Sequence, residues 1–334
     1  MKKYQITSDR GIDDLQLVEA DIPSVSELDV LVRMKASSIN YRDLATIENP
    51  TPRNISFPLV PNSDGVGEVI EVGSKVTRVA VGDRVCGIFF QSWVDGEITS
   101  TDMANALGGT IDGVLSEYRK FDENGVVKVP EHLTDAEAST LPCAGVTAWN
   151  SLVEKGSVKP GSSVLLLGTG GVSIMALQIC QMLGVKAILT SSSDEKLIRA
   201  KALGAWHVIN YKREPNWDLQ VLEMTDGVGV DHVVEVGGAG TLSKSINSVR
   251  ISGSIGLIGI LTGGAIDPTS ILRKSLHVHG IYVGHRRMFE DMNRAISAHK
   301  MRPVIDHCYS IATAREAYHA MRAAKHFGKL AITL

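Results

Sequence analysis

Residues Val164–Ser173 read V-L-L-L-G-T-G-G-V-S, an apolar run that ends in a glycine-rich turn. The first glycine allows a tight turn from a strand into a helix, and the second allows the backbone to approach a pyrophosphate. The helix expected from about Val172 would direct its free N–H groups and the positive end of its dipole at the same place. We therefore predict a dinucleotide site at this turn, formed by Gly168, Gly170, Gly171 and Val172.

A glycine pattern alone is weak evidence, because an ordinary glycine-rich turn can match it. Ser173 also stands where a third glycine is usual. The surrounding unit supports the prediction, since an amphipathic stretch runs to Gly184 and a second strand is expected over Lys186–Thr190. The third position requires a small residue where the helix packs on the strand, so serine is acceptable if its hydroxyl finds a partner.

Composition limits the classes of partner. A length of 334 residues favours two domains, and 44% hydrophobic residues can supply a large core. The net charge of -3 argues against nucleic acid as the main ligand. The four cysteines lie far apart without a C-x-x-C pair, which favours a reducing, cytoplasmic setting. We find no signal-like or membrane-length apolar run, so no membrane partner is expected.

The pattern of the chain changes near its first third. Residues 1 to about 124 contain short β-like runs between glycines and prolines, at Asp29–Ala36, Gly65–Val72, Asp83–Phe90 and Val114–Lys120. From about residue 133, helical and strand patterns alternate, which specifies a parallel sheet covered by helices. We therefore predict an α/β protein. Its doubly wound (Rossmann) cofactor domain spans 125–285, and an irregular, mainly-β catalytic domain is formed by 1–124 and 286–334.

Further motifs extend over nearly the whole chain. They are S-S-I-N-Y-R-D-L at 37–44, P-N-S-D-G-V-G-E-V-I-E-V-G at 61–73, V-A-V-G-D-R-V at 79–85, L-P-C-A-G-V-T-A-W at 141–149 and H-F-G-K-L at 326–330. In this order, and with the glycine turn, the chain resembles the medium-chain dehydrogenase/reductase superfamily. It is similar to the branch of zinc-independent quinone oxidoreductase-like and zinc-type alcohol dehydrogenase-like proteins. The resemblance implies a GroES-like fold for the catalytic domain.

The zinc enzymes of that superfamily carry metal ligands at positions where this chain differs. It has Asn40, Ser63 with Asp64, and Cys143 where those enzymes have Cys, His with Glu, and Cys. A catalytic zinc needs three protein ligands, which a single thiolate cannot supply. The segment Gln91–Gly109, which matches the lobe with four structural cysteines, contains none. We predict that no metal binds and that Cys143 is a small buried residue.

The cofactor preference depends on the end of the second strand. An NAD-binding enzyme of this fold places an acid there for the ribose 2′-hydroxyl, whereas this chain has Ser191. A serine does not repel a 2′-phosphate, and Ser192 and Lys196 can form hydrogen bonds with one. We therefore favour NADPH (NADP+) over NADH. Alternatively, these residues are a helix start capped by Ser193 or Asp194.

Other cofactor contacts are expected where strands end, because ligands bind at the carboxyl edge of such sheets. These candidates are Val236, Ile258, Tyr282 and Val283. The resemblance also implies that Thr147 lies beside the nicotinamide, that Tyr211 lies near the adenosine phosphate, and that the last strand presents backbone to the nicotinamide amide. The alternatives are a Thr147 hydroxyl bonded to its own helix and a Tyr211 that is simply a strand-end aromatic.

Without a metal, another group must stabilise the charge that develops on oxygen when a hydride arrives. Asn40 is our first candidate because its amide donates hydrogen bonds at neutral pH. Tyr41 is a second donor that can supply a proton. Asp64 is a third candidate, although its surroundings are also good turn chemistry. We expect Arg42 and Asp43 to form an ion pair that orients this loop.

These observations favour an NADPH-dependent reductase of quinones, enones or other activated alkenes and carbonyls. The alternatives are an alcohol dehydrogenase and a non-catalytic, crystallin-like NADPH-binding protein. Phe89, Phe90 and Trp93 lie in the variable segment expected to line the substrate pocket, which suggests an apolar or aromatic substrate. By family analogy, the strand expected at His277–Val283 pairs across a homodimer.

Overall fold

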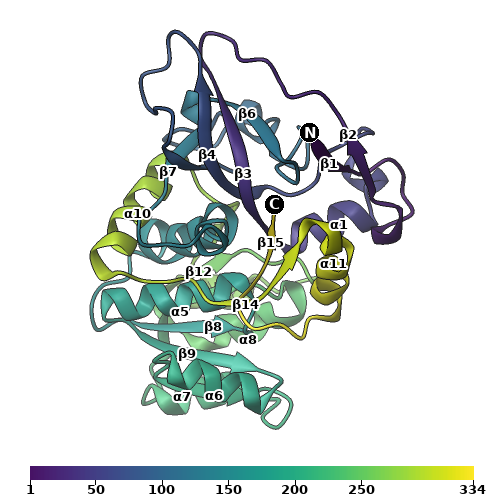
Figure 1. The fold of residues 1–334 in the computed structure, drawn as a ribbon. Helices are drawn as coiled ribbons and strands as arrows, with labels where there is room; N and C mark the ends of the chain where they lie inside the picture. Colours follow the sequence, from purple (N-terminus) through teal and green to yellow (C-terminus); the bar gives the residue numbers. More distant parts are fainter. The chain divides into compact units, whose positions relative to one another are not determined.

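The computed structural model describes residues 1–334 and divides into two units (Figure 1). The first unit comprises Met1–Val146 and Gly284–Leu334, and the second comprises Thr147–Val283. The sequence placed the first boundary at 124/125 and the second at 285/286. Residues 125–146 instead lie in the first unit because the short strand β7 (Val126–Lys128) pairs with β5 (Arg84–Gly87). A strand of three residues gives too little alternation to be detected in the sequence.

The first unit contains a seven-stranded sheet with the order β14-β15-β3-β4-β5-β7, and β6 also pairs with β3. Its remaining strands are β3 (Asp29–Ile39), β4 (Asp64–Val72), β6 (Tyr118–Asp122), β14 (Ile305–Ser310) and β15 (Lys329–Thr333). A separate two-stranded sheet is formed by β1 (Lys2–Gln5) and β2 (Gln16–Glu19). Figure 1 shows the yellow C-terminal strand β15 beside the purple β3, with which it pairs antiparallel. This pairing joins the C-terminal strand to the sheet of the first unit.

Short helices connect these strands. They are α1 (Tyr41–Glu48), α2 (Ser100–Met103), α3 (Asp135–Ala138), α10 (Arg286–His299) and α11 (Ala314–Ala323), with 3-10 turns at Ile12–Asp14, Thr51–Arg53, Glu123–Gly125 and Ile311–Thr313. One core of the unit packs α1 and α11 against the sheet around the fully buried Tyr318. That packing fixes the position of the loop before α1, where the candidate catalytic residues lie.

The second unit contains a six-stranded sheet in which every neighbouring pair of strands is parallel. The order is β10-β9-β8-β11-β12-β13, formed by β8 (Ser163–Leu167), β9 (Lys186–Ser191), β10 (His207–Asn210), β11 (Val230–Glu235), β12 (Val249–Leu257) and β13 (His277–Gly280). Its helices are α5 (Gly171–Leu183), α6 (Asp194–Ala202), α7 (Trp217–Met224), α8 (Ala239–Ser248) and α9 (Thr269–Arg273). The predicted Rossmann class is therefore confirmed.

Two segments differ from the predicted secondary structure. The pattern over Val146–Glu154 predicts one regular helix, whereas the structure has α4 (Val146–Trp149) flanked by π-helical turns at Leu141–Gly145 and Asn150–Lys155. The strand expected over His277–Val283 ends at Gly280, and Val283 has a positive φ of 59° that no strand can continue through. No helix in this protein is long and apolar enough to cross a membrane.

Candidate active site and cofactor site

The glycine turn in the second unit has the geometry of a phosphate cradle. Gly168 has φ of +74°, and a β-carbon at Gly168 or Gly170 would meet no other atom within 4 Å. Gly170 is the N-cap residue of α5, and no side chain caps that helix. The N–H groups of the first turn of α5 are therefore available to an anion. The Ser173 hydroxyl donates to the Leu167 carbonyl at 2.6 Å, so the serine that replaces the third glycine has the partner that it requires.

The end of β9 places Ser191 in a turn. Its side chain is buried, and its hydroxyl accepts a hydrogen bond from the Ser193 N–H at 3.3 Å. It therefore supports the turn, and its contact with a cofactor stays a prediction. Ser192 is exposed, Ser193 caps α6 by accepting from the Lys196 N–H, and Asp194 is ion-paired with Arg213. The capping alternative for Ser193 is confirmed.

The loops after β11 and β12 contain a residue that sequence reasoning missed. Glu235 is fully buried, and its Oε1 accepts from the N–H groups of Gly237 at 2.7 Å and Gly238 at 3.1 Å and from the Thr241 hydroxyl at 2.7 Å. Its backbone carbonyl also accepts from the N–H of Ile258. Glu235 thus shapes the two strand ends where Val236 and Ile258 lie. An acid at the end of an apolar strand, one residue before two glycines, was the available signal.

The remaining cofactor candidates differ in exposure. Thr147 is buried on α4, whereas Tyr211 directly after β10 and Tyr282 after β13 are exposed. Val283 is buried, and its carbonyl accepts from Asn150 Nδ2 at 2.7 Å. The structure therefore places the Val283 backbone, and not a regular strand, at this sheet end.

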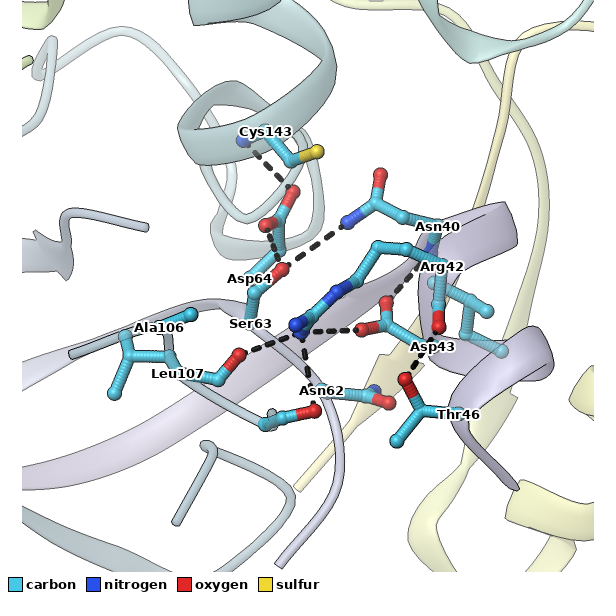
Figure 2. A network of polar contacts seen from close by, with 12 residues as sticks. Asn40, Arg42, Asp43, Thr46, Asn62, Ser63, Asp64, Ala106, Leu107 and Cys143 are labelled. Atoms are coloured by element: carbon cyan, nitrogen blue, oxygen red, sulfur yellow. Dashed lines mark hydrogen bonds and ion pairs between the residues drawn. The ribbon is translucent and has the colours of Figure 1, made fainter. Parts of the chain in front are cut away.

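In the first unit, the positions that carry metal ligands in the zinc enzymes come together (Figure 2). Asn40 Nδ2 donates to Ser63 Oγ at 3.4 Å, and Ser63 Oγ donates to Asp64 Oδ1 at 2.7 Å. Asp64 Oδ2 accepts from the Cys143 N–H at 3.1 Å. These four residues come from three separate sequence motifs. In the structure they form one hydrogen-bonded network.

Asp64 does not have the geometry of a catalytic base. Its side chain has no exposed surface, and the Ser38 hydroxyl also donates to its Oδ2 at 3.5 Å. It holds the turn that contains Cys143, and its role as a catalytic candidate stays a prediction. Burial and the neighbouring Asp64 carboxylate raise the pKa of the Cys143 thiol, which therefore stays protonated at neutral pH.

Lys329 is the second residue that sequence reasoning missed. It is buried, and its ammonium donates to the Ile39 carbonyl at 2.8 Å and to Asn40 Oδ1 at 2.5 Å. Because the Asn40 oxygen faces this cation, its NH2 group faces Ser63. Lys329 belongs to the H-F-G-K-L motif, but nothing in that motif indicated a side chain directed at Asn40.

Arg42 and Asp43 form the expected ion pair, with Arg42 Nη1 3.4 Å from Asp43 Oδ1. Arg42 Nη1 also donates to the carbonyls of Leu107 and Gly108, and Asp43 Oδ2 accepts from the Asn40 N–H at 2.8 Å (Figure 2). Burial raises the pKa of Asp43. The pair therefore ties the Asn40 loop to a neighbouring loop.

The expected substrate-lining residues are core residues instead. Phe89, Phe90 and Trp93 are buried, and the Arg42 guanidinium lies over the Phe89 ring at 4.7 Å from its centre. These side chains therefore give no evidence of an apolar or aromatic substrate. Tyr41 is exposed, with 54% of its surface accessible at the first position of α1.

The donor set does not fit a zinc ion. Asn40 and Ser63 offer neutral groups already in hydrogen bonds, and Asp64 is buried with both oxygens bonded. Cys143 is then the one thiol ligand, whereas a catalytic zinc needs three protein ligands. No three His, Cys, Asp or Glu side chains are grouped so that they could hold a metal ion. The glycine turn of the second unit, by contrast, fits the pyrophosphate of a dinucleotide.

Comparison with known proteins gives two family matches. Residues 26–131 match the family described as "Alcohol dehydrogenase GroES-like domain", and residues 171–298 match "Zinc-binding dehydrogenase". A zinc-type alcohol dehydrogenase-like protein of Schizosaccharomyces pombe (strain 972 / ATCC 24843) is 41% identical over 97% of this chain and 96% of its own length.

Solved structures resemble the whole chain. A candidate alcohol dehydrogenase of Sinorhizobium meliloti 1021 is 42% identical, with a TM-score of 0.92 and complete coverage of both chains. The quinone oxidoreductase of Pseudomonas syringae pv. Tomato DC3000 is 28% identical, with a TM-score of 0.84 over 100% of this chain and 99% of its own.

Proposed function

Because this chain belongs to the medium-chain dehydrogenase/reductase superfamily of oxidoreductases, we propose that it transfers a hydride from NADPH, without a metal ion, to a quinone, an enone or another activated alkene or carbonyl compound. The observation that supports this most is the replacement of the metal ligands. Asn40 and Ser63 put a neutral amide and a hydroxyl where the zinc enzymes have Cys and His, so Cys143 is the one matching ligand that remains, and a buried ammonium fixes the amide.

Asn40 donates the hydrogen bond that stabilises the negative charge on the substrate oxygen, a task that a metal ion performs in the zinc enzymes. Bound NADPH supplies the hydride from its nicotinamide ring. As the hydride arrives, negative charge develops on the substrate oxygen, and a fixed donor lowers the barrier. Ser63 accepts one of the two Nδ2 hydrogens of Asn40, which leaves the other to donate to that oxygen. The exposed Tyr41 hydroxyl then supplies the proton that completes the reduction.

The preference for NADPH rests on the surface after β9. Ser192 is exposed, Lys196 follows on the first turn of α6, and the exposed Tyr211 follows the neighbouring strand. Arg213 neutralises Asp194, the acid closest along the chain. This combination of a hydroxyl, a phenol and cations suits a 2′-phosphate.

An alcohol dehydrogenase is the second candidate function, favoured by the names of the relatives that are 41% and 42% identical. Oxidation of an unactivated alcohol needs a strong means of lowering the hydroxyl pKa, which a metal usually provides. The side chains at the matching positions here provide no such group.

We also propose that the protein is a homodimer formed through β13. This strand is the edge of its sheet, and Val278 on it is exposed. Ile260, Leu261 and Leu272 are large exposed apolar residues on nearby segments of the same unit. An open edge beside apolar side chains favours strand addition by a second copy.

The decisive experiment follows NADPH oxidation with a panel of quinones and enones, with and without a chelator. Asn40→Ala should lower kcat by about a hundredfold to a thousandfold, as loss of one oxyanion donor does. Asn49→Ala, at the exposed C-terminal end of α1, should leave kcat unchanged and serves as the matched control.

Three outcomes would contradict the proposal. Loss of activity on chelation would show that a metal takes part. Faster oxidation of alcohols than reduction of quinones would favour an alcohol dehydrogenase. Tight NADPH binding without turnover of any electrophile would favour the non-catalytic alternative.

A further inference from the structure

Val283 has a backbone conformation that its side chain disfavours. Its φ of 59° lies in the left-handed region, which β-branched residues rarely adopt. Such a residue persists only when its surroundings hold it, and these cases concentrate at functional sites. Val283 is buried directly after the last strand of the parallel sheet, where ligands of this architecture bind.

The side chain of Asn150 holds this residue. Asn150 Nδ2 donates to the Val283 carbonyl at 2.7 Å, across 133 residues of chain. Asn150 is only 3% exposed, and it begins the π-helical turn Asn150–Lys155. Wide helical turns of this kind are rare and frequently occur at functional sites.

An asparagine at position 150 reduces the stability of the folded state. Its Oδ1 is buried without a hydrogen-bond partner. An unsatisfied buried acceptor destabilises the folded state, and an apolar side chain of similar size would avoid that cost. Two unfavourable features, the orphaned oxygen and the left-handed valine, thus coincide at one hydrogen bond, as expected for a functional constraint.

We propose that Asn150 is a positioning residue for the nicotinamide end of the cofactor. It fixes the Val283 backbone so that this segment presents a constant set of groups to the nicotinamide ring. The inference rests on the proposed function, because it requires a nicotinamide cofactor. It adds a residue that acts through the backbone of another and does not touch the reacting atoms.

The experiment compares NADPH with 2′-phospho-ADP-ribose, a fragment that keeps the phosphates but lacks the nicotinamide. Asn150→Leu removes the orphaned Oδ1 but leaves the Val283 carbonyl without its donor, so the two effects on stability offset one another and the net change should be small. Its Kd for NADPH should rise by up to about tenfold, the value of one net hydrogen bond. Its Kd for the fragment should stay at the wild-type value, and the KM for NADPH should rise more than kcat falls.

Asn293→Leu is the matched control. Asn293 is also buried, its Nδ2 donates to the Lys128 carbonyl at 3.0 Å, and its Oδ1 likewise has no partner. It lies in the first unit, on α10, so its loss should not change the ratio of the two Kd values. If Asn150→Leu does not fold, Asn150→Asp keeps the volume, loses the donor and should show the same selective weakening.

The outcomes separate this inference from the proposed function. Unchanged binding of both ligands by the Asn150 variants would overturn the inference, and so would equal weakening of both. A wild-type protein that binds neither NADPH nor the fragment would instead overturn the proposed function, and the inference with it. If NADH binds more tightly than NADPH, NADH and ADP-ribose are the pair to compare.

Discussion

The ammonium of Lys329 donates to the amide oxygen of Asn40 at 2.5 Å inside the first unit. This contact fixes the orientation of the Asn40 amide, because an ammonium can only donate and the amide oxygen is the only acceptor of that side chain. The NH2 group is thereby directed at Ser63 and is available as a donor. Lys329 thus determines the chemistry that Asn40 can perform.

Replacing Lys329 tests this relationship. Lys329→Met keeps an unbranched chain but leaves the Ile39 carbonyl and Asn40 Oδ1 without their donor. We expect kcat for quinone reduction to fall by about tenfold to a hundredfold, because a misplaced catalytic group loses much of its effect. Lys325→Met, at an exposed position nearby in the sequence, should keep wild-type kcat. An unchanged kcat in Lys329→Met would show that Asn40 does not depend on the ammonium.

Ser192 should control the cofactor preference. Ser192→Asp places a negative charge on the exposed surface after β9, where it repels a 2′-phosphate and can bind a 2′-hydroxyl. The ratio of kcat/KM for NADPH to that for NADH should fall by about tenfold or more. Ser191→Ala, at the buried position beside it, should leave the ratio unchanged. If this ratio changes in Ser191→Ala but not in Ser192→Asp, then Ser191, and not Ser192, is the residue that contacts the 2′-phosphate.

His232 should make the protein less stable in acid. It is buried between the hydroxyls of Ser151, at 2.9 Å, and Ser254, at 2.8 Å, and burial lowers its pKa from 6.5 to about 3. Below pH 6.5 the unfolded chain binds a proton that the folded chain does not, so stability falls with pH by about 1.4 kcal/mol per unit until pH 3.

Urea unfolding at pH 7.5 and pH 5.0 measures this effect. The His232 contribution should destabilise the wild-type protein by about 2 kcal/mol between these values. His232→Gln stays neutral, so the difference in unfolding free energy between the two pH values should shrink by that amount. Equal pH dependence in both proteins would show that the pKa of His232 is the same in the folded and unfolded chains.

The β13 edge should determine the oligomeric state. Val278→Asp places a charge on the open strand, and sedimentation should show the wild-type dimer shifting towards monomer. Leu219→Asp, at an exposed position on α7 of the same unit, is the control and should remain dimeric. A wild-type protein that sediments as a monomer would contradict the proposed dimer.

Local patterns predicted much of the fold. The apolar run before Gly168 and the alternation that follows it specified a parallel sheet, and β8, β9 and β13 overlap the strands expected at Val164, Lys186–Thr190 and His277–Val283. The first unit was predicted less completely. The boundary after residue 124 was wrong because β7 is too short to recognise, and its assignment depends on pairing with β5.

The sequence by itself determined the superfamily, the glycine turn and the replacement of metal ligands by Asn40 and Ser63. Each of these follows from residues close together along the chain or from the order of the motifs. Tertiary structure alone decided which side chains face the sites. It buried Ser191 and Asp64, and it brought Lys329 to Asn40 across 289 residues and Asn150 to Val283 across 133. Such contacts depend on how strands pair and helices pack, and no local pattern of residues encodes the direction of a distant side chain.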